Sequence, residues 1–138
     1  MNRQNSENKS ISQVRVRYAE TDQMGVVHHG NYAQFFEIGR LSWLEGYGIS
    51  YKSMEEEGVQ LPVYELKTRY KKPAYFDDVL TIETSLREKP TVKITFDYVI
   101  KNENKDVITT GETTLVFMNT KSNRPIRCPD YILSALGF

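Results

Sequence analysis

The feature that most constrains this chain is an aromatic-rich segment, residues 32–47, whose apolar side chains recur at helical spacing. One stripe runs through Tyr32, Phe36, Gly39, Trp43 and Tyr47. Further apolar residues cover much of the remaining circumference, and a helix that is apolar nearly all round is a buried one. Gly39 lowers helix propensity by about 1 kcal/mol relative to alanine, which indicates close approach of another backbone. The rest of the chain is therefore expected to cover one central helix.

Segments that alternate apolar and polar residues flank this helix and predict β-strands. They are 11–19, 63–71, 80–86, 92–100 and 107–119. In 63–71 every second side chain is apolar or threonine, so one face should be buried, and Gly111 predicts a bulge in the last strand. Short helical segments are expected at 53–58 and 130–136. Because short connections favour antiparallel pairing, the pattern predicts an α+β fold whose sheet wraps around the helix.

Composition limits what this chain can be. Its 138 residues suit one domain, and we expect a disordered tail over 1–10 and a single domain over 11–138. Lysine and arginine number 18 and so do aspartate and glutamate, which leaves no overall field to attract nucleic acid or a membrane surface. Cys128 is the single cysteine and indicates a reducing compartment. With no signal peptide and no apolar run that could span a bilayer, we expect a soluble cytoplasmic protein.

The chemistry-bearing residues cluster in 18–32, between the first strand and the central helix. This connection holds both histidines and the carboxylate of Asp22. At a helix start, unpaired backbone N–H groups favour an anion or a developing oxyanion. A general base or nucleophile beside an oxyanion site is the minimum equipment for hydrolysing an acyl compound.

The same connection carries a family resemblance. Asp22-x-x-Gly25-x-Val27-x-His29-x-x-Tyr32, followed by Phe35-Phe36-Glu37 and Arg40, resembles the signature of the 4-hydroxybenzoyl-CoA thioesterase-like hotdog family. Within it, the chain is similar to the small bacterial acyl-CoA thioesterases of the Tol-Pal-associated type. Residues 73–78, Pro-Ala-Tyr-Phe-Asp-Asp, resemble a second block of that family, whereas His28 stands where many relatives carry an aromatic residue.

The resemblance implies a hotdog fold, in which a five-stranded antiparallel sheet wraps around a long central helix. It also implies dimers joined edge to edge, or tetramers built from them, with an active site at each dimer interface. The expected substrate is an acyl-CoA, and no metal or dissociable cofactor is expected. Adjacent histidines rarely project to one point, so we expect no metal site made of Asp22, His28 and His29.

Asp22 is the expected catalytic carboxylate, either as general base on water or as a nucleophile that forms an anhydride. The alternative is that Asp22 only closes an Asx turn. The backbone N–H groups of His29 and Gly30 are expected to polarise the thioester carbonyl, whereas His28 is expected to hydrogen-bond to backbone.

Tyr32, Lys67, Arg69 and Lys71 are the expected substrate-binding residues. The three basic residues, together with Lys72, form a cluster that could meet the phosphates of coenzyme A, although a solvated strand face explains the same alternation. Glu37 is interpreted as the outward edge of the helix or as the partner of Arg40, not as a catalytic acid.

These features predict an acyl-CoA thioesterase. An acyl-carrier-protein thioesterase and a non-catalytic module that binds acyl thioesters are the alternatives.

Overall fold

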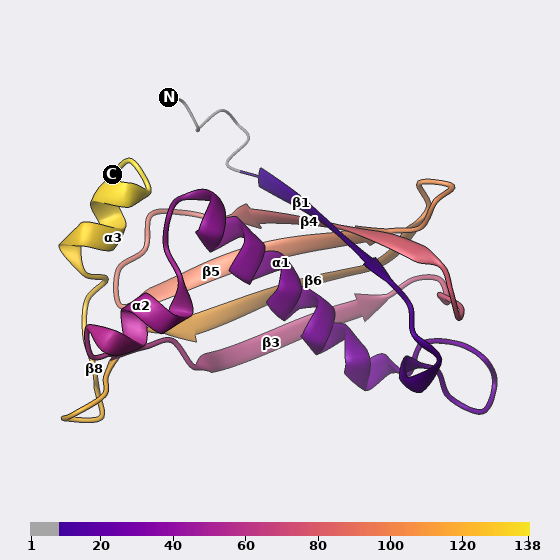
Figure 1. The fold of residues 1–138 in the computed structure, drawn as a ribbon, viewed down its shortest axis with the longest axis horizontal. Coiled ribbons are helices and arrows are strands. Elements are labelled where there is room, and N and C mark those ends of the chain that lie inside the picture. The colour runs from indigo at the N-terminus through magenta and orange to yellow at the C-terminus, as the bar shows by residue number, and fades with distance from the viewer. Residues whose placement is uncertain (1–8) are drawn as a thin grey trace.

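A computed structural model describes residues 9–138 and shows one long helix lying against a five-stranded sheet (Figure 1). The helix is α1 (Tyr32–Gly46). The strands are β1 (Lys9–Arg15), β3 (Val63–Tyr70), β4 (Val79–Leu86), β5 (Lys93–Lys101) and β6 (Val107–Val116). Their order across the sheet is β1-β4-β5-β6-β3, and every neighbouring pair is antiparallel. The predicted hotdog arrangement is confirmed.

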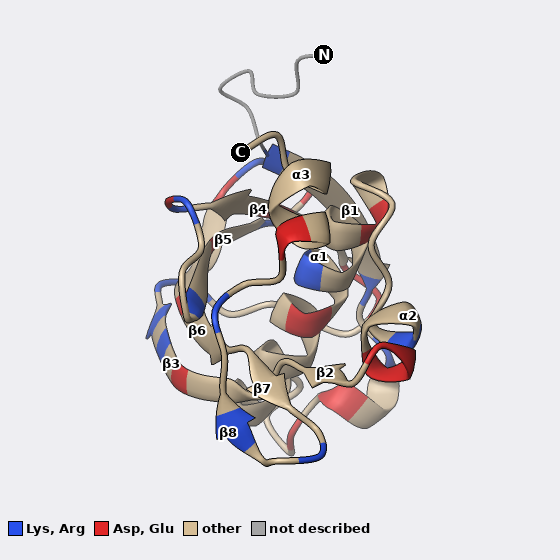
Figure 2. Ribbon diagram, turned by 90° about the vertical axis from the view of Figure 1, so that its left-hand side faces the viewer, with Lys and Arg blue, Asp and Glu red and all other residues tan. Residues whose placement is uncertain are grey.

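Smaller elements close one end of the fold. Helix α2 (Tyr51–Glu56) follows α1, and α3 (Asp130–Ala135) ends the chain, as the sequence predicts. A second sheet, absent from the sequence prediction, joins β2 (Val59–Gln60), β7 (Met118–Asn119) and β8 (Arg124–Pro125) in the order β2-β7-β8 (Figure 2). Its strands are two residues long, too short to leave a periodic pattern.

The core lies between α1 and the inner face of the sheet. Phe36 and Trp43 of α1 are buried, and strands β4 and β5 bury alternate residues beneath them. Phe36 stacks on Tyr98 of β5 with ring centroids 4.5 Å apart. The helix is not buried all round, however, because Ile38 is 40% exposed and Glu37 is exposed beside it. The prediction of a fully covered helix is therefore wrong on this one side.

Two glycines mark where helix and sheet come closest. A Cβ atom at Gly39 would collide with Thr84 and would lie 2.9 Å from Cγ2 of Ile82, so helix and sheet do approach closely here, but Gly39 meets side chains of β4 and not a backbone as predicted. Gly111 is not at a bulge, because it pairs in register with both Thr68 and Tyr98. A Cβ atom there would instead collide with the Phe36 ring, so glycine at 111 makes room for a helix side chain.

Strand β3 departs most from the sequence expectation. Residues 64–70 alternate as a half-buried strand would, yet seven of the eight residues of β3 are exposed and Thr68 is only partly buried. The reason is its position at the edge of the sheet, whereas α1 packs mainly on β1, β4 and β5. Its apolar face, with Leu66 at 45% and Tyr70 at 52% exposure, is open in the single protomer.

The first strand is shifted relative to its prediction. It begins at Lys9, inside the predicted tail, and ends at Arg15, because Tyr18–Glu20 forms a 3₁₀ turn. The remainder of the predicted tail, residues 1–8, lies outside the described residues.

Candidate functional site

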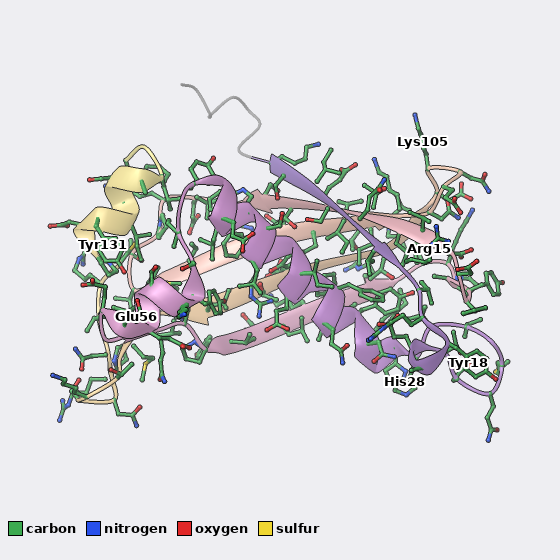
Figure 3. All side chains as sticks on the ribbon, viewed as in Figure 1. Arg15, Tyr18, His28, Glu56, Lys105 and Tyr131 are labelled. Carbon is green, nitrogen blue, oxygen red and sulfur yellow. The ribbon has the colours of Figure 1, made fainter. Side chains whose placement is uncertain are left out.

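The connection between β1 and α1 folds back on itself to form a closed loop. The N–H of Asp22 donates to the Val26 carbonyl at 2.8 Å, and Thr21 bridges Val27 in antiparallel fashion. The loop lies beyond one end of the sheet, beside the start of α1, where Tyr18 and His28 are labelled in Figure 3. These contacts hold Asp22 next to Val26 and Val27 of the same signature.

Asp22 both closes this loop and keeps a free oxygen. Its Oδ1 accepts the N–H of Met24 at 2.8 Å and that of Val26 at 3.4 Å. The Asx turn, which the sequence offered as the alternative interpretation of Asp22, is thus present. Oδ2 has no hydrogen bond to a described residue, and the residue is exposed. One side chain can therefore hold the turn with one oxygen and offer the other to a ligand.

The two histidines have different surroundings at the helix start. His28 Nδ1 accepts the N–H of Gly30 at 3.1 Å, which confirms its predicted backbone role and engages the Gly30 donor. The His29 N–H, by contrast, donates to no described residue, because His29 opens the 3₁₀ turn His29–Asn31 that precedes α1. The two imidazoles stack with centroids 4.3 Å apart. The open backbone donor at this point is that of His29.

A hollow of about 360 Å³ gathers four of the predicted site residues. Asp22, His29, Tyr32 and Lys71 all line it. The other lining residues are Val26, Val27, Tyr70, Lys72 and Pro73. Val27 and Pro73 belong to the two family blocks and Lys72 to the basic cluster, but none of the five was predicted as a site residue. Gly30, Lys67 and Arg69 do not line this hollow.

Two tyrosines form one wall of the hollow. Tyr32 is 3% exposed, and burial raises its pKa, while the Thr109 hydroxyl acts in the opposite direction. Tyr70, at the end of β3, lies 5.6 Å from the Tyr32 ring and 6.0 Å from the His29 ring, centroid to centroid. Its hydroxyl donates to the His29 carbonyl at 3.3 Å. Alternation along β3 assigned Tyr70 to a buried face, whereas the edge position leaves it open to the hollow.

The two sequence blocks of the resemblance lie side by side. The Val27 N–H donates to the Ala74 carbonyl at 2.8 Å, and Val26 bridges Tyr75. The second block is itself fixed by Asp78, whose carboxylate accepts the Tyr75 N–H at 2.8 Å. Residues 73–78 thus pack against the loop through their backbone pairing with Val26 and Val27, and Pro73 lines the hollow.

The basic cluster divides between two faces of the sheet. Lys67 and Arg69 line a separate hollow of about 380 Å³ with Asp97 and Glu112, on the face away from α1. Lys67 lies 3.6 Å from the Glu112 carboxylate, whose pKa is lowered chiefly by its hydrogen bond from Arg87. Of the four basic residues, Lys71 and Lys72 line the hollow that holds Asp22. The Lys72 ammonium lies 3.6 Å from the Asp106 carboxylate.

Arg40 and Glu37 do not form an ion pair. Glu37 is exposed, as predicted for an outward edge of the helix. Arg40 is 6% exposed and its Nε donates to the Tyr51 hydroxyl at 3.3 Å. Burial alone would lower the pKa of Arg40, but contacts with the Tyr98 and Tyr51 hydroxyls raise it overall.

Among residues 9–138, no group of three or more histidine, cysteine, aspartate or glutamate side chains is arranged to hold a metal ion. Within the same residues, no helix has the length and hydropathy needed to cross a membrane.

The chain is similar to known thioesterases over most of its length. Residues 16–136 match the model of the Thioesterase-like superfamily. The chain is 32% identical over 118 residues to YneP of Bacillus subtilis, covering 86% of each protein. It is 29% identical to the acyl-CoA thioester hydrolase YbgC of Escherichia coli O6:H1, covering 88% of this chain and 90% of that one.

The fold also matches a solved structure. The DHNA-CoA thioesterase of Staphylococcus aureus superimposes with a TM-score of 0.85 at 37% identity, covering 89% of this chain and 83% of that one. The family model, the sequence relatives and this structure agree on the same region. This chain belongs to the Thioesterase-like superfamily.

Proposed function

We propose that this protein hydrolyses the thioester of an acyl-CoA to a free acid and coenzyme A. The observation that carries the proposal is the pairing, in one hollow, of the unengaged Oδ2 of Asp22 with the open N–H of His29. A carboxylate and an oxyanion donor that line one small space are what acyl transfer requires. Membership of a thioesterase family supports the thioester as the bond that is cleaved.

Two mechanisms fit this arrangement. In the first, Asp22 removes a proton from water, the resulting hydroxide attacks the thioester carbonyl, and the C–S bond breaks to release the thiol of coenzyme A. In the second, the Asp22 carboxylate attacks the carbonyl and expels the thiolate, and water then hydrolyses the anhydride. In both, the His29 N–H stabilises the negative charge on the carbonyl oxygen.

The Gly30 N–H is a weaker candidate as a second donor. It already donates to His28 Nδ1, so it could serve the oxyanion only after the His28 imidazole moves away. The loss of one oxyanion donor typically costs about 10²–10³ in rate, so His29 alone would supply a useful share.

The substrate contacts are proposed from the same hollow. Tyr32 and Tyr70 would flank the thioester, and the Lys71 ammonium would face the phosphates of coenzyme A with Lys72 nearby. Lys67 and Arg69 lie on the other face of the sheet, so they would meet coenzyme A only from a ligand bound by another protomer.

The test is thiol release across a panel of short, long and aromatic acyl-CoAs, with Asp22→Asn beside the wild type. Asparagine keeps the oxygen that accepts from Met24, so the loop should survive, but it removes the charge that either mechanism needs. We expect a loss in kcat of at least about 10²–10⁴ and an unchanged thermal melt. Asp130→Asn, at the start of α3, makes the same chemical change at the far end of the fold and should keep full activity (Figure 1).

Any of three results would contradict the proposal. A folded Asp22→Asn variant that retains more than about a tenth of the wild-type kcat would exclude the carboxylate role. If the wild type hydrolysed acyl groups only from an acyl carrier protein, with salt-sensitive binding of the carrier, the carrier-protein alternative would replace the coenzyme A substrate. A protein that binds acyl-CoAs without releasing thiol would be the non-catalytic module.

A further inference from the structure

We infer that Asn31 is a positioning residue, which fixes the distance between Asp22 and His29 by tying the two ends of their loop together. The inference rests on the proposed function, because it concerns the geometry of the same two groups. Asn31 does not line the hollow, so any effect it has on turnover must act through the loop.

The tie is made at a single carbonyl oxygen. The Glu20 carbonyl accepts the His28 N–H at 2.9 Å and the Asn31 side-chain Nδ2 at 2.8 Å. Asp22 follows Glu20 by two residues, and His29 lies between the two donors. Both donors therefore hold the His29 end of the loop against the Asp22 end.

The acceptor end of this tie is rigid. Glu20 is 5% exposed, and its carboxylate accepts the Arg17 N–H at 2.7 Å and the Arg17 Nε and Nη2 groups at 3.1 and 3.0 Å. The side chain thus locks the 3₁₀ turn Tyr18–Glu20, and the backbone carbonyl of the same residue faces the loop donors. If this contact loosens, the residues that move are therefore His28 to Asn31 and not Glu20.

Asn31 stands where a helix cap is expected but does not act as one. It directly precedes α1, but its backbone is already helical (φ −81°, ψ −12°), because the 3₁₀ turn His29–Asn31 runs into the helix, and a usual N-cap residue is not helical. Its side chain makes no cap hydrogen bond and instead donates across eleven residues to Glu20. The side chain is therefore used as a donor to Glu20 and not as an acceptor at the helix start.

The need for a donor gives a direct experiment. Asn31→Ser and Asn31→Asp keep a polar side chain at this position, but serine is too short to reach the Glu20 carbonyl and aspartate has no donor at neutral pH. Asn31→Ala removes the side-chain amide altogether. We expect all three variants to lose about 10- to 100-fold in kcat, the scale of a 1 Å misplacement of reacting groups, with KM within about threefold of the wild type.

The control is Asn119→Ala, at the far end of the fold. Asn119 also holds a turn with its side chain, by accepting the N–H groups of Lys121 and Ser122 at 2.9 Å each. Losing that side chain should lower the melting temperature and leave kcat unchanged. The comparison separates a general cost of loosening a turn from an effect on the site.

A second measurement does not depend on turnover. Amide hydrogen exchange at His28, which shares the Glu20 acceptor, should accelerate in the Asn31 variants and stay constant in Asn119→Ala. Faster exchange at His28 together with a loss of kcat would support the inference. If the wild type released no thiol at all, the proposed function would fail, whereas exchange would still report on the tie.

The inference is judged on the serine and aspartate variants, because they stay polar but cannot donate to the Glu20 carbonyl. If Asn31→Ser or Asn31→Asp kept kcat within about threefold of the wild type, the contact with Glu20 would not matter for turnover and the inference would be overturned. If Asn31→Ser failed to fold, the tie would be holding the fold rather than the site, and the inference would be overturned as well. Unchanged exchange at His28 would contradict it independently.

Discussion

Asp22 illustrates why a catalytic and a structural interpretation of one residue need not compete. The sequence left an Asx turn and a catalytic carboxylate as alternatives, and the fold assigns the turn to Oδ1 while leaving Oδ2 without a described hydrogen bond. The turn hydrogen bonds would fix the orientation of the carboxylate, which pre-organises the free oxygen. The Asp22→Asn variant tests the proposed catalytic role of the carboxylate.

A pH effect on stability is expected at Cys128. The thiol is 4% exposed, and burial raises its pKa from 9.0 to about 11. Between these values the unfolded chain loses this proton while the folded chain keeps it, so the free energy of unfolding falls as the pH rises. Urea unfolding from pH 8 to 11 should show this decline, and Cys128→Ala should show a shallower one. Parallel curves for the two proteins would contradict the assignment.

Gly111 should tolerate no side chain. A Cβ atom at this position would collide with the Phe36 ring and would lie 3.0 Å from the Lys67 carbonyl, so both the helix and a neighbouring strand would have to shift. We expect Gly111→Ala to destabilise the fold by about 1–3 kcal/mol in chemical unfolding, the range for overpacking a core. Gly46→Ala, at a helical position with open space around it, is the control and should be neutral or stabilising. Equal stability of the two variants would show that Phe36 can move aside at no cost.

At the scale of elements, the two edges of the sheet should behave differently. We propose that β3 pairs with a second copy of the chain, because its apolar side chains lie open along a full strand, a surface that soluble proteins normally cover. Leu66→Lys should therefore weaken assembly and lower activity.

The matched control for this edge is Ile11→Lys on β1, at the opposite side of the sheet. Ile11 is 62% exposed, against 45% for Leu66, so the two substitutions place a charge on similarly open strand positions. Sedimentation of both variants decides the question. If Ile11→Lys dissociated and Leu66→Lys did not, the interface would lie at the β1 edge and the proposal for β3 would be wrong.

Sequence pattern predicted the elements that bury one face and missed those that do not. Helix α1 begins at the predicted Tyr32, and β4 and β5 alternate as expected, because burial against a core imposes a period. The 3₁₀ turn at Tyr18–Glu20 and the two-residue strands of the small sheet are too short to carry one. Strand β3 shows the alternation of apolar and polar residues although its apolar face is exposed in one protomer. The pattern indicates that a face is apolar but not what covers it.

The candidate site was predictable where its residues lie close together in the sequence. The motif supplied Asp22, His29 and Tyr32, which lie near one another in sequence, and the fold brings them to one hollow. Tyr70 and Pro73 join them only through the pairing of β3 with β6 and the docking of residues 73–78 on the loop. Such long-range placement leaves no local signal. For Lys67 the local signal was present, because alternation along β3 places this side chain on the face opposite Tyr70.

At the scale of the whole molecule, activity should not depend on a metal. The described residues offer no cluster of three ligands, and the stacked imidazoles of His28 and His29 lie side by side rather than converging on a point. Dialysis against a chelator should leave thiol release unchanged, with the untreated protein as reference. Stoichiometric zinc or iron in the purified protein, with activity lost on its removal, would contradict the proposed chemistry.

The last prediction concerns assembly, for which we propose a homodimer or a tetramer built from dimers. The exposed side of α1 and the open face of β3 adjoin one another, and a hollow of about 340 Å³ lies between them, lined by Glu37 and Arg40 of the helix and by Val63 and Leu66 of the strand. A second copy on the β3 edge would cover both surfaces at once, since a two-fold axis places the same patch on each protomer. It would also bring an apolar wall next to the hollow that holds Asp22, where the acyl group must leave water.

Assembly and turnover should therefore fall together. Light scattering at micromolar concentration should give at least twice the mass of one chain, and specific activity should decline on dilution at the same concentration at which the mass falls. Leu66→Lys should shift both midpoints to higher concentration by the same factor. A monomer that keeps full specific activity would show that each chain holds a complete site on its own.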